Sequence, residues 1–516
     1  MSMKPILSIL FAASCGLPAA QMPNVLFIAV DDLKPMLGCY GDTVIKTPNI
    51  DRLASRGTTF LNAYCQQAIC GPTRASLLTG LRPDSTGIYD LQTKLRALHP
   101  DVITLPQYFK QNGYESVGIG KIFDPRNVEG EVRDDPKSWS RPYTKQIENA
   151  DSRLGFLKPD FVKRVDVVVN EKGLKQSDLE AITKAVGGMP TEEIDQDVPD
   201  GAYQDGALAK RAIELVGELS KGEKPFFLAV GFYKPHLPFV APKKYADMYS
   251  IDDIRLAKFR KMPEGAPSLH YQPSWELKNG SYAGFANFQG KVTDDLERNL
   301  VHGYMACVSY LDAQVGRLLD SLEANGLSDN TIVVLWGDHG WHLGDHGMWC
   351  KHTNYEQATR SPLIISRPQN GPRGAKSASP VEFVDVFPTL CDLAGLPKPP
   401  ALEGCSLVPI LENPEVKVKE VAVSQYPRGH GKDELMGYAF RDKRYRYIEW
   451  VPKGKPGGQP VATELYDYQT DPLETKNLAT DPERAEALAN MRGIAKNFHL
   501  KNRVSPSSSG EYPVTR

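Results

Sequence analysis

The sequence has almost no excess charge, no internal repeat and no apolar run long enough to cross a membrane. Its 61 lysine and arginine residues against 63 aspartate and glutamate residues give a net charge of −2. A basic stripe would be needed to bind nucleic acid, so this balance disfavours that class, and any affinity for an anion has to be local. The 516 residues, 41% of them hydrophobic, suffice for one large globular domain and a smaller one.

The N-terminus is typical of a secretory signal peptide at residues 1–20. An apolar stretch at 6–13 follows a lysine, and small residues at 18–20 offer a cleavage region. We therefore expect an exported protein, periplasmic or secreted. Lipidation at Cys15 is disfavoured, because Ala12 stands three residues before it where leucine is usual.

Cysteines are few, eight in all. One falls in the signal peptide and one in a motif described below, which leaves Cys39, Cys65, Cys307, Cys350, Cys391 and Cys405. In an exported protein some of these could pair. Cys391 and Cys405 flank a proline-rich turn, and we expect either a disulfide between them or two buried thiols.

Four apolar runs of strand length each stop at charged or imidazole side chains. Continuous apolar runs suit strands that are buried on both faces of a parallel sheet. Helical stretches, such as 205–219 and 299–323, lie between them, which favours an α/β fold with a mostly parallel sheet sandwiched by helices. The runs are Asn24–Val30 before Asp31 and Asp32, Glu115–Gly120 before Lys121, Pro225–Val230 before Lys234 and His236, and Thr331–Trp336 before Asp338 and His339.

Because ligands of open α/β sheets bind beyond the carboxyl ends of the strands, the side chains at these ends predict a site. Asp31, Asp32 and Asp338 are hard oxygen donors, and His339 adds a nitrogen, so the set favours Ca²⁺ or Mg²⁺. The alternative for the paired aspartates is a strand-end turn with solvated carboxylates.

Residues 338–352 hold four histidines and allow a second interpretation of the metal site. His339, His342 and His346 with Asp338 and Asp345 could form a zinc cluster of a two-metal phosphatase. The spacing is loose and glycines interrupt any helix that would align the histidines, so we favour one metal, with His342 and His346 structuring the loop.

The most informative segment is residues 70–80, CGPTRASLLTG. Pro72 suits the first turn of a helix and Gly80 suits its C-terminal end, which places Cys70 at a helix N-terminus. Free N–H groups and the helix dipole favour negative charge there, and Arg74 adds a cation one turn on. The segment therefore predicts a reactive group that meets an anionic substrate; the alternative is a buried structural cysteine.

The same segment resembles the sulfatase signature Cys-x-Pro-x-Arg-x-x-x-x-Thr-Gly. The resemblance implies an alkaline-phosphatase-like fold and a sulfuric ester hydrolase whose Cys70 is oxidised to formylglycine (3-oxoalanine) by a maturation enzyme. It also implies one divalent ion, usually calcium, bound by Asp31, Asp32, Asp338, His339 and the modified Cys70.

The resemblance assigns further roles by position. Lys121, His236 and Lys351 contact the sulfate or protonate the leaving alcohol, and together with the metal they would stabilise the charge that develops. Arg126, Lys234 and His352 are additional substrate-binding candidates. Such sulfatases usually have a histidine shortly after this lysine; here Asp124 stands instead, either as a substitute base or as a cap or a partner of Arg126.

Longer stretches, among them 23–42, 224–245 and 338–365, resemble the iduronate-2-sulfatase-like subgroup of that family. A sulfated sugar or polysaccharide is therefore the expected substrate, with a 2-O-sulfated uronate or a comparable algal sugar as the leading candidate. The rival hypotheses are a phosphomonoester or phosphonate hydrolase of the same superfamily and a non-catalytic glycan-binding relative.

We expect a catalytic domain at 21–418, a smaller α+β domain at 419–504 and a Ser/Pro-rich tail at 505–516 that is typical of disorder. Segments 126–200 and 253–297 have the composition of insertions near the pocket mouth. The second offers Tyr271, Trp275 and Tyr282 for stacking on sugars or for ordinary loop packing, and a C-terminal loop with Arg428, His430 and Lys432 could reach a substrate anion.

Overall fold

The computed structural model describes residues 22–129, 134–147, 149–175, 177–283, 285, 292–368 and 372–501. The predicted signal peptide with Cys15 and the predicted tail at 505–516 lie outside the described residues. Among the helices of the described ranges, none has both the length and the apolar character needed to cross a membrane.

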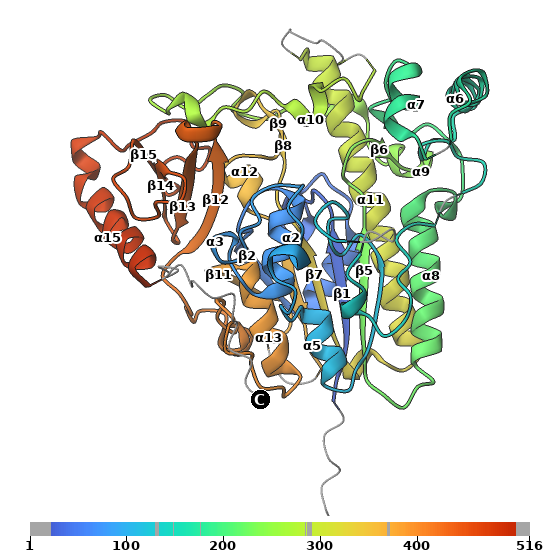
Figure 1. The fold of residues 1–516 in the computed structure, drawn as a ribbon, viewed down its shortest axis with the longest axis horizontal. Helices are drawn as coiled ribbons and strands as arrows, with labels where there is room; N and C mark the ends of the chain where they lie inside the picture. The colour runs from blue at the N-terminus through green and yellow to red at the C-terminus, as the bar shows by residue number, and fades with distance from the viewer. Residues whose placement is uncertain are drawn as a thin grey trace, which may run out of the picture.

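A seven-stranded sheet forms the centre of the molecule (Figure 1), in the order β11-β2-β10-β7-β1-β5-β3. Every strand runs parallel to the others except β10, which is antiparallel to both of its neighbours. The mostly parallel sheet is therefore confirmed. The strands are β1 (Asn24–Val30), β2 (Thr58–Tyr64), β3 (Glu115–Gly120), β5 (Phe226–Phe232), β7 (Thr331–Gly337), β10 (Leu363–Ser366) and β11 (Ala375–Glu382).

The four strands predicted from apolar runs are adjacent, as β7-β1-β5-β3. Strand β1 has no exposed residue because alternate side chains enter two separate cores: Leu26 and Ile28 lie in one, Val25 and Phe27 in the other. Burial on both faces explains why the run is continuously apolar rather than alternating. β5 begins one residue later than predicted and continues to Phe232.

Helices cover both faces of this sheet. The long helices α8 and α11 pack with α1 on the first core, and α2, α5 and α13 pack on the second. The described helices are α1 (Pro48–Arg56), α2 (Cys70–Thr79), α3 (Pro83–Thr86), α4 (Leu95–Leu98), α5 (Leu105–Gln111), α6 (Pro159–Lys172), α7 (Leu179–Ala185), α8 (Gln204–Leu219), α9 (Lys243–Ala246), α10 (Trp275–Lys278), α11 (Asp294–Ala324), α12 (Glu356–Thr359), α13 (Val386–Leu393), α14 (Val408–Glu412) and α15 (Ala485–Lys501).

A second, antiparallel sheet of four strands follows near the C-terminus and packs against α15 (Figure 1, left). The sheet lies within residues 419–504, where the sequence predicts a smaller α+β domain. Its strands are β12 (Ala422–Arg428), β13 (Leu435–Arg441), β14 (Tyr445–Pro452) and β15 (Ala462–Asp467). Two short pairs complete the strands, β4 (Glu192–Glu193) with β6 (Phe239–Val240) and β8 (His342–Leu343) with β9 (Trp349–Cys350).

The suggested disulfide between Cys391 and Cys405 is wrong, because both are free thiols. Cys391 lies inside α13 and points into the second core, whereas Cys405 is exposed on the segment that follows. The alternative of two buried thiols holds for Cys391 only.

A buried arginine joins the C-terminal sheet to the rest of the molecule. The side chain of Arg446, on β14, is 0% exposed; it bonds to Glu356 of α12 and to Thr359 Oγ1 at 3.0 Å, and its Nε lies 3.3 Å from Glu474 Oε1. Burying these charges is tolerated because each is paired, so removal of one partner leaves the others uncompensated.

We predict that Arg446→Leu lowers the free energy of unfolding by about 3–5 kcal/mol, because Glu474 would stay buried without this guanidinium and Glu356 would lose one of its arginine partners. Chemical denaturation followed by tryptophan fluorescence measures the change. Lys443→Leu, which removes an exposed cation from the same hairpin, is the control and should have a much smaller effect. Equal losses in the two variants would contradict the role of the buried network.

Candidate active site

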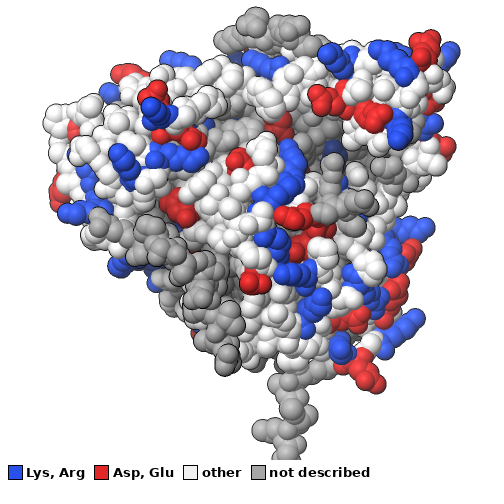
Figure 2. Space-filling view, viewed as in Figure 1, with Lys and Arg blue, Asp and Glu red and all other residues white. Residues whose placement is uncertain are grey.

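The predicted functional side chains meet at the carboxyl ends of β1, β3, β5 and β7, next to the N-terminus of α2. Most of these side chains are buried, and the surface around them is mixed in charge: Figure 2 shows basic and acidic side chains interspersed over the face it displays. The anion-binding capacity of the site therefore comes from a few groups held inside the fold.

The turn after β1 brings two consecutive carboxylates to one place. Successive residues of a strand point to opposite faces, so an extended chain would separate Asp31 from Asp32. Asp32 instead has φ 60°, in the left-handed region that aspartate tolerates. Its N–H donates to Asp338 Oδ1 at 3.0 Å, and the hydroxyl of Tyr304 donates to its carbonyl oxygen at 2.8 Å. These bonds fix the turn and direct both carboxylates into the site.

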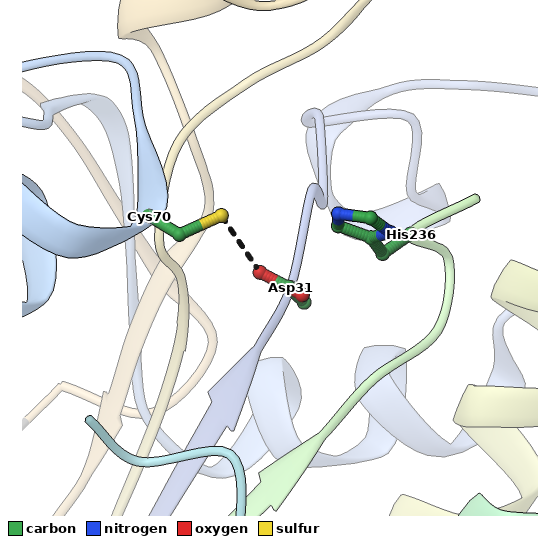
Figure 3. A group of neighbouring side chains, drawn as sticks. All are labelled: Asp31, Cys70 and His236. Atoms are coloured by element: carbon green, nitrogen blue, oxygen red, sulfur yellow. Dashed lines mark hydrogen bonds between the residues drawn. The ribbon is translucent and has the colours of Figure 1, made fainter. Parts of the chain in front are cut away.

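Cys70 occupies the first turn of α2, as predicted, although the helix begins at Cys70 itself rather than after it. Gly80 ends the helix with φ 69°, also as predicted. The sulfur lies 3.4 Å from Asp31 Oδ1 and 3.4 Å from His339 Nε2. Figure 3 shows the thiol and the imidazole of His236 on either side of Asp31. Burial raises the pKa of the Cys70 thiol well above its usual value, so an unmodified Cys70 would be a weak nucleophile at neutral pH.

The five predicted metal ligands are brought together. Carboxylate oxygens of Asp31, Asp32 and Asp338 lie within 4.8 Å of one another, and ligand atoms of Asp32, Cys70 and His339 do the same. Each of these residues is at most 1% exposed. Burial raises the pKa of Asp32 despite the nearby His236 and Lys351. A buried set of hard oxygen donors fits a divalent cation such as calcium or magnesium.

Arg74 connects this cluster to the neighbouring strand ends. Its side chain is 0% exposed. Nε donates to Asp338 Oδ2 at 2.9 Å, and Nη2 donates to Asp31 Oδ1 at 3.3 Å. Nη1 donates to the carbonyl oxygens of Lys121 and Ile122, the two residues that follow β3. The ends of β1, β3 and β7 are thus tied to one guanidinium.

A glycine turn directs Lys121 inward from the end of β3. Gly120 has φ 81°, and a Cβ there would lie 2.0 Å from the carbonyl oxygen of Gly231. Lys121 Nζ lies 2.6 Å from Asp31 Oδ2. Burial raises the pKa of Asp31, but the charges of Lys121, His236 and Arg74 together outweigh this effect and hold the pKa well below its usual range. Asp31 is therefore ionised.

Two further predicted groups approach from the opposite side, next to Asp32. Lys351 Nζ lies 2.8 Å from Asp32 Oδ1, and His236 Nε2 lies 3.7 Å from Asp32 Oδ2. The Lys351 side chain is 3% exposed, whereas that of His236 is 25% exposed. His236 therefore lies at the solvent-facing edge of the site.

Glu276 belongs to this site and was missed by the sequence analysis. Its Oε1 lies 3.0 Å from both His236 Nε2 and Lys351 Nζ. Burial raises the pKa of Glu276, but Lys351 and His236 outweigh it and hold the pKa well below its usual range. The residue lies on the four-residue α10, inside a segment that the sequence marks only as an insertion. Its neighbour Trp275 was noted, but no spacing or motif signals the carboxylate.

The predicted partnership of Asp124 and Arg126 is confirmed. Arg126 donates to the Asp124 carboxylate from its backbone N–H at 3.0 Å, from Nε at 2.9 Å and from Nη2 at 2.8 Å. Lys121 Nζ lies 3.8 Å from the same carboxylate. Burial raises the pKa of Asp124, and these cations lower it well below its usual range, which makes it a weak base. The Arg126 side chain is 48% exposed, at the mouth of the site.

Lys234 stabilises the loop that carries His236 rather than pointing its ammonium at the metal cluster. Its Nζ donates to the carbonyl oxygens of His236 at 2.8 Å and Pro238 at 2.5 Å. Burial lowers the pKa of Lys234. Its substrate-binding role stays a prediction.

His352 and Arg428 lie next to each other. The His352 ring packs edge-on against Tyr426 at 5.9 Å, and burial lowers its pKa to about 3, so it is neutral. Arg428 donates to the carbonyl oxygens of His352 and Leu269. Arg428 thus holds backbone in place, whereas His430 and Lys432 are exposed. Substrate contacts by these residues stay predictions.

The loop-structuring role of His342 and His346 is supported by their contacts. His342 Nε2 pairs with Thr353 Oγ1 at 2.9 Å, and His346 stacks on Tyr355 at 4.3 Å with Nε2 3.0 Å from the carbonyl oxygen of Leu473. Within the part of the chain that the structure describes, neither histidine belongs to a group that could hold a metal. The arrangement favours the single-metal interpretation.

Comparisons with known proteins agree with this geometry. The sulfatase family profile matches residues 23–396, and the profile described as N-sulphoglucosamine sulphohydrolase, C-terminal, matches residues 344–499. The chain is 35% identical to iduronate 2-sulfatase of Homo sapiens, over 89% of this chain and 92% of that protein.

Solved structures show the same fold. One, of a protein in complex with its substrate D-glucosamine-2-N,6-O-disulfate, has a TM-score of 0.69 at 22% identity and covers 94% of this chain and 99% of its own. A phosphonate monoester hydrolase from Silicibacter pomeroyi has a TM-score of 0.70 at 22% identity, covering 93% and 96%. The expected alkaline-phosphatase-like fold, with a C-terminal antiparallel region, is confirmed.

We predict that chelation destabilises the protein, because Asp31, Asp32 and Asp338 would repel one another without a cation. Dialysis against EDTA should lower Tm, and calcium at about 100 times its Kd should restore about 2.7 kcal/mol of stability. Elemental analysis should find one calcium or magnesium ion per chain. A Tm that neither chelation nor calcium changes would contradict the metal site.

We predict that Glu276→Gln tightens the binding of inorganic sulfate about tenfold, or ~1.4 kcal/mol. The reason is that the Glu276 carboxylate pairs with Lys351 and His236, the same cations that sulfate would bind. The measurement is the inhibition constant of sulfate. Glu171→Gln, on the exposed face of α6, is the charge-matched control and should leave the constant unchanged. Weaker sulfate binding in Glu276→Gln would contradict this competition.

Proposed function

The chain belongs to the sulfatase family and is a sulfuric ester hydrolase, and from this premise we propose that it removes sulfate from a sulfated sugar with a modified Cys70 as nucleophile. The main support for the proposal is that the sulfur of Cys70, at the N-terminus of α2, lies 3.4 Å from both Asp31 Oδ1 and His339 Nε2. These are the positions that the family signature assigns to nucleophile and metal, and here they meet in one buried cluster.

The nucleophile is proposed to be formylglycine, made from Cys70 by a maturation enzyme. Members of the family generally use this residue together with a divalent metal. The raised pKa of the thiol supports the modification, since Cys70 itself would be largely protonated. The metal is proposed to be calcium, with magnesium as the alternative. It would be held by Asp31, Asp32, Asp338, His339 and the modified Cys70, and would supply Lewis-acid stabilisation of the oxygens around sulfur.

The remaining residues act on the two ends of the bond that breaks. Lys121 and Lys351, each beside a metal-site carboxylate, hold the sulfate oxygens, and Arg74 keeps Asp31 and Asp338 oriented. A hydroxyl oxygen of the hydrated formylglycine at position 70 would form the new bond to sulfur. As the sulfur–oxygen bond to the sugar breaks, His236 donates a proton to the departing oxygen. Its partial exposure supports this role, because the sugar has to leave toward solvent.

The substrate is proposed to be a 2-O-sulfated uronate or a comparable sugar of an algal polysaccharide. The support is the 35% identity to a protein named iduronate 2-sulfatase. We further propose export through residues 1–20 and a division into a catalytic domain at 21–418 and a C-terminal domain at 419–504. The antiparallel sheet begins just after this boundary, at Ala422.

A phosphonate or phosphomonoester hydrolase is the second candidate, favoured by the structural likeness to the phosphonate monoester hydrolase. At 22% identity that likeness carries the fold alone. Turnover of 4-nitrophenyl sulfate, 4-nitrophenyl phosphate and a phenyl phosphonate ester under the same conditions distinguishes the two. We expect the sulfate ester to have the highest kcat/KM.

We predict that Cys70→Ala abolishes sulfate release, lowering kcat at least 10³-fold, while circular dichroism and Tm stay close to those of the parent protein. Cys65→Ala is the matched control: Cys65 is equally buried, but its sulfur faces the carbonyl oxygen of Ala358 at 3.9 Å. It should keep full activity. Full turnover by Cys70→Ala, or no sulfate ester hydrolysis by the parent protein matured in a host with a formylglycine-generating system, would contradict the proposal.

We predict that Asp124→Asn raises KM about tenfold with little change in kcat, because Arg126 and Lys121 lose the carboxylate that orients them. Steady-state kinetics on 4-nitrophenyl sulfate measure this. Asp84→Asn, whose carboxylate accepts hydrogen bonds from Tyr89 and Gln425 away from the cluster, is the control. A burst of one equivalent of alcohol followed by stalling would instead assign Asp124 as the base that regenerates the nucleophile.

A further inference from the structure

A cleft of about 1230 Å³ opens beside the catalytic cluster. One wall is the segment at 271–281, which contains α10; the other walls are α7 with residues 187–189 and the segments at 146–155 and 202–204. Figure 1 places α7 and α10 at the top of the molecule, on the side where the parallel strands end. Pockets for drug-sized ligands measure roughly 300–1,000 Å³, so this cleft has room for a longer ligand.

Two large aromatic side chains are presented to this cleft. Trp275 is 65% exposed and Tyr271 is 49% exposed, and both side chains line the same cleft. Tyr282, the third aromatic candidate from the sequence, is 5% exposed and packs in the core instead. The stacking surface is therefore formed by Trp275 and Tyr271.

Two walls of the cleft adjoin groups of the reaction centre along the chain. Trp275 immediately precedes Glu276, whose carboxylate lies 3.0 Å from His236 Nε2. On the opposite wall, Gln204 immediately precedes Asp205, whose carboxylate accepts the backbone N–H of Lys234 at 2.8 Å. Both walls are thus one residue along the chain from groups that contact the loop of His236.

The remaining lining suits a carbohydrate. Amide and hydroxyl side chains of Gln146, Asn149 and Ser281 can exchange hydrogen bonds with sugar hydroxyls, while an aromatic face covers the apolar face of a sugar ring. Lys184, exposed on α7, adds a cation that an anionic sugar would favour.

We propose that this cleft binds a chain of sugar residues that extends from the sulfated one, so that the protein acts on sulfated oligosaccharides in preference to the isolated sugar. The proposal rests on the proposed function, since it places the chain next to the sulfate-binding residues. Trp275 and Tyr271 stack on sugars beyond the one that carries the scissile sulfate, and they determine preference for chain length rather than the chemical step.

The test compares a heparin-derived disaccharide with a heparin-derived hexasaccharide, using 4-nitrophenyl sulfate as the reporter of the chemistry. We expect wild type to favour the hexasaccharide in kcat/KM, and Trp275→Ala to reduce that ratio about tenfold. Met248→Ala, which removes a 46% exposed side chain outside the cleft, should keep the ratio. Equal kcat/KM for the two lengths in wild type, or an unchanged ratio in Trp275→Ala, would overturn the proposal.

Calorimetric binding to the Cys70→Ala protein separates this proposal from the proposed function. If the parent protein hydrolyses no sulfate ester, the function fails, yet the cleft still predicts hexasaccharide binding that is tighter than disaccharide binding and weakened by Trp275→Ala. If 4-nitrophenyl sulfate is cleaved but the hexasaccharide binds no more tightly than the disaccharide, the function stands and the cleft proposal is wrong.

Discussion

The buried guanidinium of Arg74 is the contact on which the site depends. It lies on the helix that begins at Cys70, and it bonds to Asp31 after β1, Asp338 after β7 and two carbonyl oxygens after β3. An unpaired charge with no exposure would be very costly, so these partners have to stay where they are. The same bonds that satisfy the arginine therefore set the distances between nucleophile and metal ligands.

Burial also explains how a chain of almost neutral net charge can bind an anion. The carboxylates and cations of the cluster alternate within hydrogen-bond distance, in surroundings where water does not screen them. In this cluster the charges of the carboxylates and the cations nearly cancel. A divalent ion would add net positive charge, which would attract the negatively charged sulfate group. Glu276 covers Lys351 and His236 at the mouth, so it links the cluster to the cleft through α10.

The sequence predicts the elements whose burial pattern or motif lies within one short segment of the chain. β1, β3, β5 and β7 are continuously apolar because both faces are covered, and the polar residues after them predict the site. β2, β10 and β11 lack that signal: β11 reads AKSASPVE and contains a proline, and β10 has four residues. Their place in the sheet depends on long-range pairing. Glu276 and the cleft depend on how an insertion folds back over the strand ends, and no spacing in the sequence encodes that approach.

The most direct test of the account is mass spectrometry of the tryptic peptide Gly57–Arg74 from protein made in a host with a formylglycine-generating system. The account predicts a loss of about 18 Da that fragmentation assigns to Cys70, with Cys65 in the same peptide unchanged. An intact Cys70 that can be alkylated, in protein that nonetheless hydrolyses sulfate esters, would contradict the central claim that this buried position carries the oxygen nucleophile.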